Sequence, residues 1–244
     1  MIQSFQAFID TERWRFETRD NNLFYFAFHE VATYRFFLDI VQSRSAAIGK
    51  DYLDCMEAYG KSVEGSSGGY LTPAQQAMLD RWRELSLALR LEIETYYLLA
   101  TILLDRVAAA IGFYFEGTSS KAWARHSALA KNLEAYASAR NISVPQRLLD
   151  VAASLKDAVS GFRHEQVVHQ GSLRAMRATG FQTGQGPRLL LSNLYPTPDD
   201  QQYESLPLTD AAVMIDDYLT AVVELLATNR NRTPLQLAVS NADS

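Results

Sequence analysis

The feature that most constrains the fold is a long stretch, residues 73–116, whose apolar residues recur at helical spacing. After its first residue it contains no proline, and Gly112 is its only glycine. Thr72 offers a hydroxyl group for the N-cap, a proline follows at the first helical position, and Gln75 completes a capping box. The pattern predicts one long helix, or a helix with a kink before Arg90.

Apolar residues elsewhere also recur mainly at helical spacing, so we expect an all-α protein. Further helices are predicted over residues 21–44, 50–63, 121–140, 146–171 and 211–228. The Gly/Ser-rich stretch 65–69 separates two of them, and residues 188–191 suggest one short strand. The expected architecture is an up-and-down four-helix bundle with flanking N- and C-terminal helices.

The order of these segments predicts four regions along the chain. They are an N-terminal helical extension (1–70), a helical bundle (71–175), a loop-rich segment with a C-terminal helix that packs on the bundle (176–230), and a flexible tail (231–244). Proline and glycine are concentrated in the third region, where only its last helix has a marked start.

Composition narrows the class of protein. The formal net charge is -5 and 48% of the residues are hydrophobic, so no overall basic field would attract nucleic acid. Cys55 is the only cysteine, which fits a reducing compartment. The first residues do not resemble a secretory signal, and the most apolar stretch, 108–115, is shorter than the ~20 residues that span a membrane. We therefore expect a cytoplasmic protein without a membrane partner.

The segment GFRHEQVVHQGS (161–172) holds the strongest candidate for chemistry. Arg163, His164 and His169 lie within seven residues of one another. Arginine binds phosphate oxygens through a fixed positive charge, and histidine transfers protons near neutral pH. Both functions serve the cleavage of a phosphodiester by an internal hydroxyl, which RNA supplies as its 2′-OH. The alternative is a helix end whose cations interact with the helix dipole.

Helix geometry restricts how Arg163 and His169 can act together. Six positions on an ideal helix turn through about 600°, so the two side chains point ~120° apart. They would converge only at a distorted helix end, or where a second copy of the chain brings a matching pair into one cleft.

This stretch resembles the R-x(4–6)-H motif of the HEPN superfamily, with Arg163 and His169 at the two named positions and the polar His164 after the arginine. Residues 92–106 also look like the long second helix of HEPN-like bacterial proteins. The resemblance covers residues 73–175 and implies a homodimeric helical domain. Many members are metal-independent endoribonucleases of toxin–antitoxin and phage-defence systems, where a partner protein can neutralise them. Other members bind a nucleotide or a partner protein without turnover, or only dimerise.

A polar stripe interrupts the apolar surface of the long predicted helix. Glu94, Thr101 and Asp105 fall within ~20° of one face, and Arg90 lies one turn before them. In an HEPN-like bundle these residues would position the arginine or histidines of the motif. The alternative is a partly solvated face on which Arg90 pairs with Glu94.

The residues after the motif carry a local positive charge. Arg174 and Arg177 belong to a run from 163 to 188 that holds four arginines and one acidic residue, a balance of +3. They are candidates for contact with RNA phosphates, although a basic loop lying on the acidic body would have the same composition.

The two remaining histidines and the known cofactor motifs give weaker signals. His29 lies among aromatic residues and is expected in the core, whereas His126 begins a helix and is expected at the surface or behind the site. No zinc-type spacing, P-loop or dinucleotide fingerprint occurs, so no metal or cofactor is expected.

Overall fold

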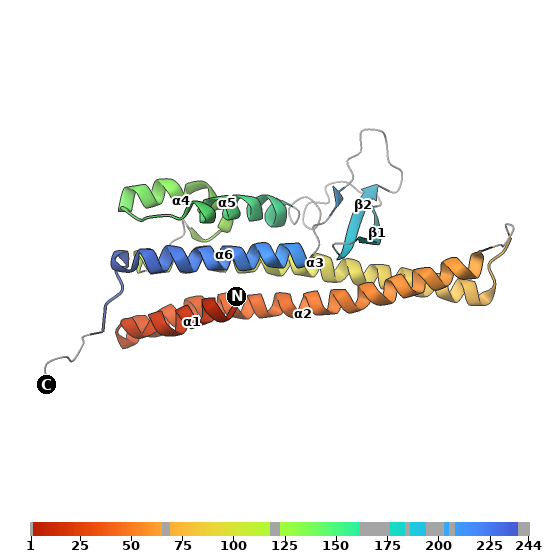
Figure 1. The fold of residues 1–244 in the computed structure, drawn as a ribbon, viewed down its shortest axis with the longest axis horizontal. Helices are drawn as coiled ribbons and strands as arrows, with labels where there is room; N and C mark the ends of the chain where they lie inside the picture. Colours follow the sequence, from red (N-terminus) through yellow and green to blue (C-terminus); the bar gives the residue numbers. More distant parts are fainter. Residues whose placement is uncertain are drawn as a thin grey trace. The chain divides into compact units, whose positions relative to one another are not determined.

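The protein is predominantly helical in the computed structural model, which confirms the expected helical character (Figure 1). The structure describes residues 2–64, 69–117, 123–161, 176–183, 186–193, 203–204 and 208–238, and from 160 to 204 only the backbone. Two compact units are present. Unit 1 comprises Met1–Leu38, Leu98–Arg163 and Ala211–Ser244, and unit 2 comprises Asp39–Tyr97 and His164–Asp210.

Helix α3 (Pro73–Glu116) is the long helix that the capping pattern predicts, without a break. The backbone N–H of Gln75 donates to Thr72 Oγ1 at 3.3 Å, and the backbone N–H of Thr72 donates to Gln75 Oε1 at 2.9 Å. The capping box is therefore formed in full. Gly117 ends the helix with φ of 71°, a backbone conformation that suits glycine.

Helix α2 (Thr18–Val63) corrects the prediction of two separate helices. The predicted gap around residues 45–49 contains no proline, and Ser45 is buried. The one glycine there, Gly49, costs about 1 kcal/mol in a helix, which packing on a neighbouring helix outweighs. A second helix, α1 (Ile2–Glu12), precedes it and is followed by the short 3-10 helix η1 (Arg13–Arg15).

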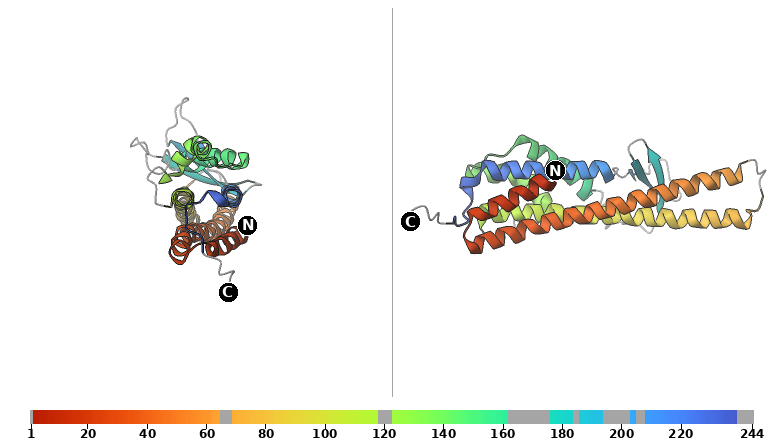
Figure 2. Two further views of the ribbon diagram at one scale, coloured as in Figure 1. Left: turned by 90° about the vertical axis from the view of Figure 1, so that its left-hand side faces the viewer. Right: turned by 60° about the horizontal axis from the view of Figure 1, so that its bottom comes forward.

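The helices of unit 1 form three layers (Figure 2). Helix α1 and the start of α2 make one outer layer, the end of α3 and α6 (Leu208–Thr228) make the middle one, and α4 (His126–Arg140) with α5 (Gln146–Leu155) makes the other. Helix α5 continues into η3 (Lys156–Gly161), a π-helix. A last 3-10 helix, η5 (Arg230–Arg232), follows α6.

Aromatic and aliphatic side chains fill the core of unit 1. Phe24 of α2 and Tyr114 of α3 have no exposed surface, and their ring centroids are 6.0 Å apart. Trp123 packs directly on the backbone of α3 at Gly112, where a Cβ atom would lie 2.7 Å from the indole ring. Phe36 and Phe37, also on α2, are exposed.

Unit 2 contains an antiparallel pair formed by the second half of α2 and the first half of α3. Arg44 of α2 pairs with Glu92 of α3, and further towards the joining loop the ring of Tyr52 lies 6.0 Å from that of Trp82. Cys55 is half-buried and free, with its Sγ 3.5 Å from the carbonyl oxygen of Met78.

Unit 2 also contains a three-stranded antiparallel sheet in the order β1-β2-β3. Its strands are β1 (Met176–Thr183), β2 (Gly186–Asn193) and β3 (Tyr203–Glu204). The short strand predicted at residues 188–191 is confirmed within β2, but its partner β1 was expected to be loop. The expected all-α fold is therefore corrected to a predominantly helical fold with one small sheet.

The described residues after α6, up to Ala238, pair with the residues at the start of α2. The backbone N–H of Glu17 donates to the carbonyl of Gln236 at 2.8 Å, and that of Ala238 donates to the carbonyl of Arg15 at 2.9 Å. Leu235 is buried. These backbone bonds with the start of α2 depend on residues more than 200 positions away, so no local pattern signals them.

Helix α3 is, among the described helices, the one long and apolar enough to cross a membrane by length and composition. Its most apolar 18-residue window has a mean hydropathy of 1.7 with at most two charged residues. That window is longer than the apolar stretch 108–115 that the sequence suggests. Within the protein 61% of it is buried, as a core helix requires.

Candidate functional site

The R-x5-H motif itself lies outside the described residues. This applies to Arg163, His164 and His169, and also to Arg174. Arg177 is described only through its backbone, which pairs with Ser192 in the β1–β2 ladder. The site is therefore built from the groups that surround the helix leading into the motif.

Glu94 lies in unit 2, where its carboxylate accepts a hydrogen bond of 2.6 Å from Arg90 Nε. The two residues form the i,i+4 pair that the sequence offers as an alternative, and both side chains are about one quarter exposed. This is the pairing on a partly solvated face that the alternative predicts. The motif residues that Glu94 was expected to position lie outside the described residues.

Asp105 holds the beginning of α4. Its Oδ1 accepts a hydrogen bond of 2.8 Å from the backbone N–H of His126, the first residue of that helix. The first turn of a helix has unpaired N–H groups and a partial positive charge, so a carboxylate there stabilises it. Asp105 thus fixes α4, and with it His126, against α3.

His126 is buried, with 1% of its surface exposed, which corrects the expectation of a surface position. Its ring lies edge-on to the ring of Tyr218 of α6, with centroids 5.2 Å apart. Neither ring nitrogen has a hydrogen-bond partner among the described residues. Burial, together with the nearby positive charge of Lys156, lowers the pKa of His126 to about 4, so the imidazole is neutral at pH 7.

We call five side chains the polar cluster of unit 1: Thr101, Asp105, His126, Lys156 and Tyr218. Thr101 is buried on α3 one turn before Asp105. The Tyr218 hydroxyl is buried without a hydrogen-bond partner among the described residues, and burial raises its pKa. Buried polar groups of this kind are uncommon in protein cores and are often found where a water molecule binds or where chemistry takes place.

The cluster has a defined chemical capacity. A neutral imidazole accepts one hydrogen bond and donates another, but it does not provide a positive charge for a phosphate. Any cation for a phosphate must therefore come from other residues. The cluster includes the first residue of η3, Lys156, and η3 ends at Gly161, two positions before Arg163.

His29 is exposed on α2, which corrects the prediction that it is a core residue. Its ring stacks on that of Tyr25 at 5.2 Å. The surrounding aromatic sequence misleads because His29 and the buried Phe28 are adjacent in the chain but point about 100° apart on the helix.

A buried carboxylate in unit 1 has no signal in the sequence. Glu12 is completely buried at the end of α1, where the hydroxyl of Tyr114 donates to its Oε1 at 2.9 Å. Arg230 Nε lies 2.9 Å from its Oε2, and Arg15 also pairs with it. These groups belong to α1, α3 and the segment after α6, so Glu12 connects parts of the chain that are far apart in sequence.

A second ion pair fixes α6 on α2. Arg35 is almost fully buried, and its guanidinium donates to both carboxylate oxygens of Asp216, at 2.8 and 3.1 Å. A bidentate ion pair of this kind fixes the orientation of the two side chains as well as the distance between them. It holds Tyr218, two residues further on, in place within the polar cluster of unit 1.

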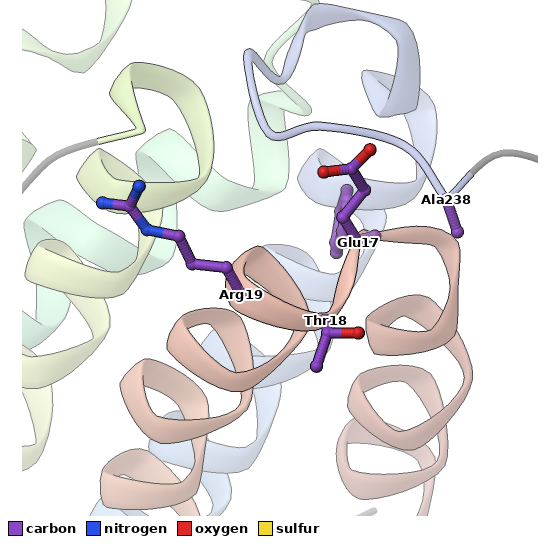
Figure 3. Close-up of a pocket in the computed structure, with 5 residues that line it drawn as sticks. Glu17, Thr18, Arg19 and Ala238 are labelled. Atoms are coloured by element: carbon purple, nitrogen blue, oxygen red, sulfur yellow. The ribbon is translucent and has the colours of Figure 1, made fainter.

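An open pocket lies where the last described residues meet the start of α2 (Figure 3). Phe16, Glu17, Thr18, Arg19 and Ala238 line it. Glu17 and Arg19 point in different directions rather than toward a shared point (Figure 3). Side chains of opposite charge that do not converge offer no defined ligand site.

No group of three His, Cys, Asp or Glu side chains that could hold a metal ion is present among the residues that the structure describes. The chain matches no family model, no curated protein and no solved structure. Its function is therefore inferred from its own residues.

Proposed function

We propose that the protein is an HEPN-like endoribonuclease that cleaves RNA through attack of the ribose 2′-OH. In this proposal Arg163 stabilises the charge on the phosphate, and His169 removes the proton of the 2′-OH or returns one to the leaving 5′ oxygen. His164 positions the phosphate. The chain acts as a homodimer, so two copies of the motif contribute to one cleft.

The observation that carries the proposal is the change from α- to π-helix at Lys156–Gly161, directly before the motif. On a straight α-helix Arg163 and His169 would point ~120° apart. The π-helix ends two residues before Arg163, so it does not itself set the angle between the two side chains. It shows that the helix is already irregular where it leads into the motif, at the place where convergence would require a distorted end. Single-turn π-helices are rare and are frequently found at functional sites.

The polar cluster of unit 1 supports a positioning role. We propose that Thr101 and Asp105 keep the helices that precede the motif in position. Asp105 does so through its hydrogen bond with the first residue of α4. Glu94 is given no role in the proposal; it lies in unit 2, where it pairs with Arg90. His126, neutral at pH 7, does not serve as the phosphate-binding cation.

Arg174 and Arg177 are proposed to contact the phosphates that flank the cleaved bond. They supply positive charge close in sequence to the motif in a protein of net charge -5. A ribonuclease of this kind belongs in the cytoplasm, in a toxin–antitoxin or phage-defence setting, with a partner protein that neutralises it.

The proposal is tested by incubating the purified protein with mixed RNA beside the Arg163→Ala/His169→Ala double variant. We expect cleavage by the unaltered protein and a rate at least ~1,000-fold lower in the variant, because both charge stabilisation and proton transfer are lost. His29→Ala is the matched control, since His29 is exposed on α2, and should cleave at the unaltered rate. Circular dichroism establishes that each variant is folded.

Two outcomes would remove the nuclease proposal. Equal cleavage by the unaltered protein and the double variant would indicate a contaminating or different active site. Absence of cleavage in both, with RNA or nucleotide still bound, would favour a non-catalytic module of the same fold.

A further inference from the structure

A regular stripe of side chains lies on the outer face of helix α2. Its members follow one another at spacings of three and four residues: Leu23, Phe26, Glu30, Thr33, Phe37 and Ile40. Five belong to unit 1, and Ile40 follows on the same unbroken helix. Phe26 is 66% exposed and Phe37 39% exposed, which is unusual for side chains of this size.

Helix geometry places the six side chains within about 100° of one another around the axis of α2. Arg35, which binds Asp216 of α6, is nine positions from Phe26 and therefore lies ~180° away. The stripe thus faces away from the side on which α6 packs. The alternation of three- and four-residue steps is the spacing by which one helix packs along another.

The order of side chains in the stripe is the same from either end. It runs from an aliphatic residue to a phenylalanine, through two polar residues, to a phenylalanine and an aliphatic residue. A two-fold axis between residues 31 and 32 would place Phe26 opposite Phe37 of the partner subunit. Leu23 would in the same way lie opposite Ile40 of the partner subunit, as an isologous contact requires.

Charge on this face points to the same occupant. Glu30 of the stripe lies 4.0 Å from Arg106 of α3, and both side chains are about half exposed. Arg19 and Arg44 continue the same spacing at the two ends of the stripe, and Arg44 pairs with Glu92. Between these ends, one acid and one base leave the stripe neutral. A nucleic acid or an anionic lipid surface would instead require an excess of positive charge.

The exposed area is sufficient for a modest dimer. A phenylalanine offers ~200 Å² when fully exposed. The stripe together with Arg106 and the exposed Ile102 of α3 provides roughly 500 Å² per subunit, or about 1,000 Å² for the pair. This is near the lower limit for a specific interface.

We propose that two copies of this chain associate through the α2 stripe, antiparallel and around a two-fold axis. The proposal uses no residue of the motif and does not rest on the nuclease proposal. Helix α2 and the α5–η3 segment that leads into the motif lie in opposite outer layers of unit 1, so this contact is separate from the pairing of two motifs in the nuclease proposal. The proposal identifies a surface and an arrangement for the second copy.

Light scattering during size-exclusion chromatography, over a range of concentrations, measures the association. We expect the unaltered protein to reach twice the 27.4 kDa chain mass at high concentration. Phe26→Ser/Phe37→Ser should raise the dissociation constant at least ~100-fold, because both aromatic anchors are lost. Val213→Ser removes a side chain that is 62% exposed on α6, and this control should leave the constant unchanged.

Disulfide trapping in a Cys55→Ser background tests the antiparallel arrangement. An equal mixture of Leu23→Cys and Ile40→Cys proteins should cross-link under mild oxidation. Each variant alone should not, because the two equivalent positions would lie ~25 Å apart. A monomer at all concentrations, a dimer unaffected by the double serine change, or cross-linking of each variant alone would overturn the proposal.

Discussion

Replacement of Glu12 by alanine is expected to lower the free energy of unfolding by about 3 kcal/mol or more. The carboxylate is completely buried and accepts a hydrogen bond of 2.9 Å from the hydroxyl of Tyr114. Its removal leaves the Tyr114 hydroxyl, which is also buried, with a weaker hydrogen bond. It also leaves the charges of Arg15 and Arg230 without their counter-ion.

Chemical denaturation monitored by circular dichroism measures this effect. Glu57→Ala is the matched control, because Glu57 pairs with Lys61 on an exposed helix surface and should contribute less than ~0.5 kcal/mol. Glu12→Gln should lie between the two, since the amide keeps a hydrogen bond with Tyr114 but loses its charge. A change of less than ~1 kcal/mol for Glu12→Ala would show that the buried ion cluster does not stabilise the fold.

Acidification is expected to destabilise the protein between about pH 6.5 and pH 4 through His126. The folded-state pKa is lowered from 6.5 to about 4, first by burial and then by Lys156. Within this interval the unfolded chain binds a proton at His126 and the folded chain does not, so stability falls as the pH falls. Above pH 6.5 both states are neutral there, and this contribution to stability is fully present.

The size of the effect follows from the shift. A difference of 2.5 between the two pKa values corresponds to a loss of about 3 kcal/mol once the pH reaches 4. Asp105, Lys156 and Tyr218 are the charged or titratable groups described beside the ring. The measurement is the free energy of unfolding in urea at a series of pH values.

Variants separate His126 from the other titrating groups. His126→Gln cannot titrate, so its stability should depend less on pH over this interval by the same ~3 kcal/mol. His29→Gln, at an exposed position, should keep the dependence of the unaltered protein. Identical pH profiles for the unaltered protein and His126→Gln would contradict the burial of a neutral imidazole.

Local chemistry in the sequence predicts helix ends better than helix packing. The start and end of α3 are correct because Thr72, Gln75 and Gly117 act on the backbone next to them. The continuity of α2 and the pairing of β1 with β2 depend on neighbours elsewhere in the chain. Such contacts leave no periodic signal in the segment itself.

The candidate site shows the same limit. The polar stripe predicted on residues 94–105 correctly places Thr101 and Asp105 on a core helix. The partner of Asp105, the backbone N–H of His126, belongs to α4 and could not be predicted. His29 is assigned to the wrong environment, and of the two positions expected for His126 the surface one is wrong. The side of a helix that becomes buried is set by the helices that pack on it. Glu12 is missed because its partners other than Arg15 are 102 and 218 residues away.

The most direct test of the nuclease proposal uses a short RNA cut by the protein at one position and the same RNA with a single 2′-deoxyribose there. We expect the all-ribose strand to yield a 2′,3′-cyclic phosphate and a 5′-hydroxyl, in the presence or absence of a metal chelator. The deoxy strand should remain intact at that position, because the attacking hydroxyl is missing. Cleavage of the deoxy strand, or products ending in a 3′-hydroxyl and a 5′-phosphate, would contradict the proposal.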